Sequence, residues 1–175
     1  MKPTFAGAAL SLGLLAGTAP AQDMMHGVDL SSPDMVSAEM TRGQVEGALA
    51  ITTANAPADF SGKRLSSLDL SGLDLSGAIF RAARLNKTRL ASANLDRAVL
   101  DQACLLEADL TGATLKGANM FASQMARARL DGADLSKARV TADLTGASLV
   151  GASIADAHLG ADMRNQSMGL MRAVL

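Results

Sequence analysis

The stretch from Ala93 to Leu115 reads ANLDRAVLDQACLLEADLTGATL, and a large apolar residue stands in it at every fifth position. The same period holds at all sixteen such positions from Leu65 to Val140. Two residues before each large residue, eleven of the thirteen positions from Ala78 to Ala138 are Ala, and the exceptions are the small residues Thr88 and Ser123. An internal repeat of five residues therefore decides the fold.

A five-residue period is incompatible with a continuous helix or strand. An α-helix turns by about 100° per residue, so each step of five would rotate the apolar side chain by roughly 140° and no apolar face would form. In a flat strand five is an odd step, so successive large residues would point to opposite faces. We therefore expect a short extended segment in each repeat, followed by a corner, with about four corners closing a square coil of about twenty residues.

The repeats resemble those of the pentapeptide-repeat family, whose consensus is A(D/N)LXX. The matching triplets are Ala93-Asn94-Leu95, Ala108-Asp109-Leu110, Ala118-Asn119-Met120, Ala133-Asp134-Leu135 and Ala142-Asp143-Leu144. The resemblance covers about two-thirds of the chain, from Phe60 onward, and implies an all-β solenoid, a right-handed quadrilateral β-helix with buried Leu and Ala columns. It implies an architecture and not one activity, because a fold hosts many functions.

The repeat phase slips twice near the end of the chain. Val140 to Leu144 and Leu159 to Met163 are steps of four, and each slip is expected to flatten or pinch one corner. Residues 168–175 fit the repeat poorly. A solenoid that stops within a repeat exposes an unpaired edge, so we expect either a covering partner or a truncated C-terminus.

The first 21 residues have the pattern of a secretory signal peptide. Lys2 supplies the positive charge, Phe5 to Leu15 the apolar stretch, and Ala19-Pro20-Ala21 the cleavage site. We expect cleavage after Ala21, export to the periplasm, and no membrane span, because the apolar stretch is too short. The single Cys104 excludes an intramolecular disulfide.

Residues 22–57 do not repeat and are predicted to form a tail and a short helical cap, followed by the β-helix over 58–175. Ser32-Pro33-Asp34 is a helix start, and Thr41 with Gln44 forms a capping signature. Gly43 and Gly47 weaken the second helix. A solenoid needs a capping element at its end, and these helices are the candidates.

Residues twenty apart should stack, which brings opposite charges together. One wall would carry Asp69, Arg89, Asp109 and Arg129, and a corner would carry Lys87, Glu107 and Arg127. These columns are interpreted either as a salt-bridge ladder that fixes the coil register or as a charged docking face. The ladder is the preferred interpretation, although exposed pairs are individually weak.

The sequence predicts no catalytic residues, no cofactor and no metal site. It contains no P-loop, G-x-G-x-x-G or zinc-ligand spacing, and a straight-sided coil offers no convergent pocket. Met24-Met25-His26 suits a soft metal by ligand type, but three adjacent residues define no geometry, so a flexible tail is preferred. His158 and Cys104 are predicted to be outward surface residues.

Two functions follow as hypotheses, and neither is enzymatic. The first is a periplasmic structural or protein-interaction scaffold whose patch of Ile79, Val99, Leu106 and Phe121 binds a protein partner. The second, taken from the family resemblance, is a DNA-mimicking protein that binds gyrase, which requires an acidic stripe. The mature net charge of 15 − 17 = −2, after loss of Lys2, suggests no nucleic-acid partner. The oligomeric state and the partner's identity stay open.

Overall fold

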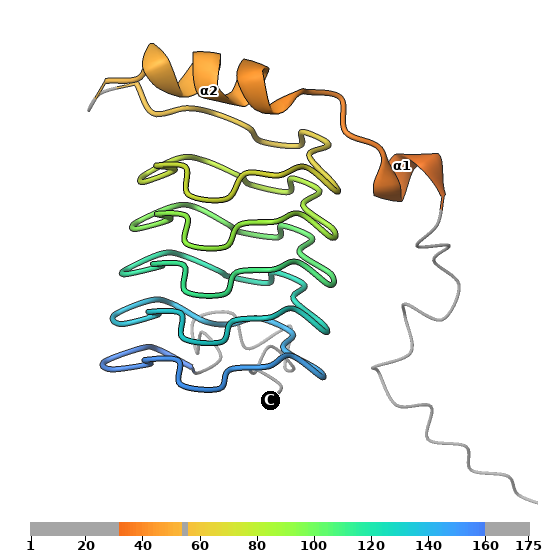
Figure 1. Ribbon diagram of the computed structural model, residues 1–175. Helices are drawn as coiled ribbons and strands as arrows, with labels where there is room; N and C mark the ends of the chain where they lie inside the picture. Colours follow the sequence, from red (N-terminus) through yellow and green to blue (C-terminus); the bar gives the residue numbers. More distant parts are fainter. Residues whose placement is uncertain (1–31, 54–55, 160–175) are drawn as a thin grey trace, which may run out of the picture.

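The computed structural model describes residues 32–53 and 56–159 (Figure 1). Two helices come first, α1 (Pro33–Val36) and α2 (Arg42–Ala50). From Ala58 onward the chain forms a stack of coils, and α2 lies across one end of the stack (Figure 1). The signal-peptide region, Met24-Met25-His26 and the second phase slip lie outside the described residues.

The coils stack in a parallel register of twenty residues. Isolated parallel bridges join Asp59 to Ile79, Ile79 to Val99 and Val99 to Asn119, and the same step recurs on each side of the coil. We name the four sides by their bridged columns. These are wall A (Asp59, Ile79, Val99, Asn119, Arg139, His158), wall B (Arg64, Arg84, Cys104, Gln124, Asp143), wall C (Asp69, Arg89, Asp109, Arg129, Ser148) and wall D (Asp74, Asn94, Thr114, Asp134, Ser153).

The five-residue columns form the core, as predicted. Every large residue of the period from Phe60 to Leu144 is buried, and so are the Ala residues two positions before them from Ala78 to Ala142. The polar exceptions are satisfied, since the Thr88 hydroxyl donates to the Leu65 carbonyl at 2.9 Å and the Ser123 hydroxyl to the Met120 carbonyl at 3.1 Å. The interior therefore holds one large and one small side chain per wall.

Apart from the corner after Val140, the described corners are hydrogen-bonded turns. The N–H of Ala98 donates to the Leu95 carbonyl at 3.0 Å, and the third residue, Arg97, has a φ of 58°. A left-handed residue at this position is what a type II turn requires. Glycine takes it at Gly112 and Gly132, whereas Arg97 and Lys87 adopt it at a steric cost because the stacked coils impose the same path on every turn.

The first phase slip changes the register, as the sequence predicted. After Val140 the bridges join residues nineteen apart, such as Gln124 to Asp143. Neither Thr141 nor Ala142 has the positive φ of the other corners, and both are buried. The shortened corner is thus pinched inward.

The N-terminal end of the coil is covered by the segment from Ala38 to Ala50. Thr41 and Gln44 form the predicted capping box at the start of α2, and Val45 packs into the core. The Glu39 N–H donates to the Arg64 carbonyl at 2.9 Å, where a preceding coil would otherwise pair. On wall C the Arg42 guanidinium takes over this role and donates to the carbonyls of Asp69 at 2.9 Å and Ser71 at 3.3 Å.

Candidate interaction surface

The predicted apolar patch is centred on wall A. Ile79 and Val99 are bridged neighbours in this wall, and both side chains are half-buried. Phe121 lies at the corner that follows the wall and is also half-buried, with the Arg139 guanidinium 5.3 Å from its ring centroid. Three of the four predicted residues therefore lie on wall A or at the corner that follows it, in three successive coils, and we call this set the wall A strip (Ile79, Val99, Phe121).

Leu106 does not belong to this strip, and its predicted exposure is wrong. It lies at the corner after wall B, one wall away from Phe121, and is only 6% exposed. Ser66 and Asn86, at the same corner of the preceding coils, are buried as well, and the Asn86 side-chain oxygen accepts from the Leu106 N–H at 3.1 Å. This corner is covered by its own stacked side chains, which the five-residue pattern does not reveal.

Charged groups border the wall A strip. Arg81 and Asp101 form an ion pair of 3.8 Å at the corner column that also contains Phe121. Asp101 is largely buried, and its Oδ1 has no hydrogen-bond partner among the described residues. Two arginines thus lie beside the strip, Arg81 in the corner column of Phe121 and Arg139 in the wall A column after Asn119.

Wall C carries the predicted charge ladder. Arg89 donates to the Asp69 carboxylate, Arg129 lies 3.8 Å from Asp109, and at the neighbouring corner Glu107 lies 3.0 Å from Arg127 and 3.9 Å from Lys87. The Arg89 guanidinium holds the pKa of the Asp69 carboxyl well below its usual range. Such a carboxylate stabilises the fold above about pH 4, and this contribution is lost as the pH falls through the lowered pKa.

Cys104 and His158, the described residues considered for thiol or metal chemistry, lie on different walls of the coil. Burial raises the pKa of the half-buried Cys104 thiol, whose nearest hydrogen-bond acceptor is the Gln124 side chain at 3.6 Å. His158 is exposed on the last described coil. No three His, Cys, Asp or Glu side chains gather into a metal-ligand cluster anywhere in residues 32–53 and 56–159. In the same part of the chain, no helix has the length and apolar character needed to cross a bilayer.

A groove that sequence reasoning missed lies between α2 and the first coil. Its volume is about 820 Å³, and Glu46, Leu49, Pro57, Leu73 and Arg97 are among the residues that line it. It lies where α2 and the segment that follows it face the corner between Leu73 and Ala78. This is a tertiary contact between segments of unrelated pattern, so no local signal could have predicted it.

Comparisons with known proteins support the repeat assignment. The family model for pentapeptide repeats matches residues 58–97, 93–120 and 103–141, with eight copies. Among solved structures, the chain is similar to alr5209, a pentapeptide repeat protein from Nostoc PCC 7120, with 27% identity, coverage of 69% of this chain and 98% of that chain, and a TM-score of 0.52.

Two further solved structures have lower TM-scores. The pentapeptide repeat protein Rfr23 from Cyanothece 51142 is 30% identical over 58% of this chain and 63% of that chain, with a TM-score of 0.31. QnrB1, a plasmid-mediated fluoroquinolone resistance protein, is 22% identical over 63% of this chain and 61% of that chain, with a TM-score of 0.39. No curated protein matches the chain.

Proposed function

The chain belongs to the pentapeptide-repeat family, whose members are generally structural or interaction proteins, and from this premise we propose that it is a non-catalytic scaffold that binds a protein partner on wall A. We also propose that its coil is right-handed, as the family resemblance implies. The wall A strip is the observation that carries the proposed function. It consists of Ile79 and Val99, which stack on wall A, and of Phe121 at the corner that follows the wall in the next coil.

The wall behind this strip is rigid, which favours binding. The N–H of Ile79 donates to Ala58 of the preceding coil at 2.9 Å, and its carbonyl accepts from Phe60 at 2.7 Å. Val99 is held in the same way, since its N–H donates to the Ala78 carbonyl at 3.0 Å and its carbonyl accepts from the Phe80 N–H at 2.7 Å. A preorganised surface loses little conformational entropy when it binds, and an aromatic residue with a neighbouring arginine is a typical interface anchor.

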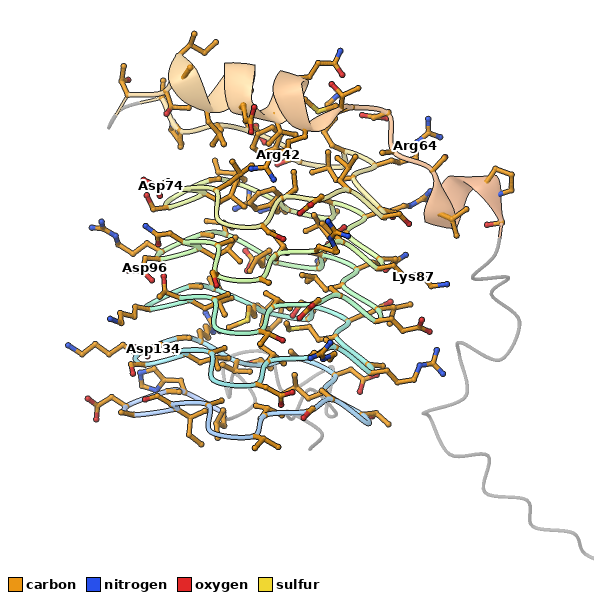
Figure 2. All side chains as sticks on the ribbon, in the orientation of Figure 1. Arg42, Arg64, Asp74, Lys87, Asp96 and Asp134 are labelled. Carbon is orange, nitrogen blue, oxygen red and sulfur yellow. The ribbon has the colours of Figure 1, made fainter. Side chains whose placement is uncertain are left out.

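The surface favours this function over DNA mimicry. A duplex mimic needs a continuous acidic stripe, but wall C alternates Asp with Arg, and wall B begins with Arg64 and Arg84. On wall D, Asp134 lies 3.3 Å from Lys116, and Asp74 accepts a hydrogen bond from the neutral Asn94 side chain at 3.0 Å. Figure 2 shows Lys87 on the opposite side of the coil from Asp96 and Asp134.

Replacing Phe121 by Ser should reduce partner capture. The change removes the aromatic ring of the strip and the Arg139 contact, but it leaves the core period intact. Tagged wild-type and variant proteins would be compared in a quantitative pull-down from periplasmic extract. We expect at least one protein to be lost with the variant. Lys116→Ser at the corner that follows wall D, where the side chain is 54% exposed, is the matched surface control and should capture the wild-type set. Identical capture by all three proteins would exclude the strip as the binding surface.

We propose that the scaffold acts in the periplasm after removal of residues 1–21. Lys2, the apolar stretch and the small residues Ala19 and Ala21 support this localisation. N-terminal sequencing of protein from the periplasmic fraction is expected to begin at Gln22. Intact Met1 on protein that stays in the cytoplasm would contradict the localisation without affecting the wall A proposal.

A further inference from the structure

The charges of the wall C column alternate in a fixed order along the coil, starting with an acid at the α2 end. Its first four members, from the α2 end downward, are Asp69, Arg89, Asp109 and Arg129. Within the column they form two ion pairs, Asp69 with Arg89 and Asp109 with Arg129, and in both the acid lies nearer to α2. At the α2 end, Asp69 also lies 3.8 Å from Arg42. The arginine side chains are about two-thirds exposed, at 64% and 60%. The column therefore presents the sequence minus, plus, minus, plus to the solvent.

This sequence of charges is complementary to itself when wall C of a second copy faces it in an antiparallel orientation. A two-fold axis that lies between the second and third coils, in the plane of the interface, pairs the first coil with the fourth and the second with the third. Asp69 then faces Arg129 of the second copy, and Arg89 faces Asp109 of the second copy. A parallel arrangement at the same level would instead place each charge against its own copy.

The neighbouring corner obeys the same symmetry. Its column is Ser67, Lys87, Glu107 and Arg127, so the same axis pairs Lys87 with Glu107 of the second copy and Ser67 with Arg127. The other corner of wall C is made mostly of small residues, and its one charged residue in these four coils, Asp131, faces Ser71 of the second copy across the same axis. No like charges meet in these columns.

The other three walls are not complementary to themselves in charge across the same two-fold axis. On wall D the same axis would place Asp74 against Asp134 of the second copy, which is repulsive. On wall B it would pair Arg64 with Gln124 and Arg84 with Cys104, which offers no opposite charges. Wall A has apolar residues at its centre. Self-complementarity is thus a property of wall C.

We propose that wall C is a homodimerisation surface on which a second copy of this chain docks antiparallel. Four coils at a spacing of about 4.8 Å give a face roughly 19 Å tall. Such a face is smaller than a stable interface of standard size, so the dimer is weak and depends on concentration and salt. Because wall A is the opposite side of the coil, the dimer would display two wall A strips facing outward.

The test is sedimentation equilibrium of the mature chain over a wide concentration range, with thermal unfolding of each protein measured in parallel. Wild type should form a dimer whose Kd rises by about tenfold or more between low and high salt, because exposed charge pairs are screened. Arg89→Glu should abolish the dimer, since it places an acid against Asp109 of the second copy. A wild type that stays monomeric at every concentration would overturn the proposal.

Two double variants separate pairing between copies from pairing within the chain. Arg89→Glu with Asp109→Arg gives the column minus, minus, plus, plus, which disrupts the alternation within the chain but stays complementary across the axis, so the dimer should return. Asp109→Arg with Arg129→Asp keeps an ion pair within the chain but gives minus, plus, plus, minus, which sets like charges against each other, so the dimer should be lost.

Both doubles lose the same hydrogen bonds between Asp109 and Thr111, so they are matched for this local effect. The opposite result, with the second double dimeric and the first monomeric at an unchanged melting temperature, would overturn the two-fold arrangement. If the first double variant does not fold, the second double variant and the salt dependence of the wild-type dimer still test whether wall C forms the dimer interface. Arg81→Glu with Asp101→Arg, which exchanges an ion pair outside wall C, should leave the dimer unchanged.

Discussion

Replacement of Leu110 by Ala is expected to lower the free energy of unfolding by about 2–5 kcal/mol, as for other fully buried leucines. Leu110 lies between Leu90 and Leu130 in the central column behind wall C, and all three are essentially inaccessible to solvent. The stacked backbones are held by hydrogen bonds on both sides, such as the one from the Leu110 N–H to the Arg129 carbonyl at 2.7 Å, so they cannot collapse into the cavity.

Denaturant melts measure this loss. The matched control is Val150→Ala, because Val150 is 76% exposed and its truncation should change the stability by less than about 0.5 kcal/mol. Equal losses at the two positions would show that the five-residue period does not mark the interior of the coil.

Replacement of Ala113 by Leu should cost about 1–3 kcal/mol or more, because it overpacks the narrow interior. Ala113 lies between Ala93 and Ala133 in the small column of wall D, and all three are buried. Leu73 stands in the same column on the first coil, where the coil ends beneath the cap segment and the side chain is only partly buried. A large side chain is therefore accommodated at the end of the stack, whereas the middle has coils on both sides.

Thermal melts of Ala113→Leu and of Thr114→Leu give a matched comparison. Thr114 is the next residue, and its half-buried side chain belongs to the outer column of wall D. The same change there loses only the hydrogen bond from its hydroxyl to the Asn94 side chain at 3.1 Å, so it should cost less than about 1 kcal/mol. A stable Ala113→Leu variant would mean that the interior has room for two large residues per wall.

The distorted corner after Val140 could be predicted from the sequence. The step of four after Val140 predicted a distorted corner, and the structure has one, with Thr141 and Ala142 drawn inward. The prediction succeeded because a coil of fixed circumference must shorten one corner when a residue is missing. The capping box of Thr41 and Gln44 was predictable for a similar reason, since both hydrogen bonds are local.

The candidate surface was predicted only in part. The stacking of Ile79 on Val99 follows from the twenty-residue register, but the burial of Leu106 depends on Asn86 and the other side chains at its corner. The repeat predicts which residues face outward, but at this corner a side chain that faces outward is still buried. Side-chain packing between coils, which no periodicity encodes, decides between them.

The sequence by itself determined the repeat, the coil register, the buried columns and the alternating charges of wall C, because each depends on spacing along a chain that repeats its own geometry. Only the tertiary structure decided how the end of the coil is closed. Arg42 replaces the hydrogen bonds of an absent coil at the carbonyls of Asp69 and Ser71, from a position 27 residues before Asp69. A contact between a helix and a solenoid has no common period, so its partners are set by the packing of the folded chain and not by the pattern of either segment.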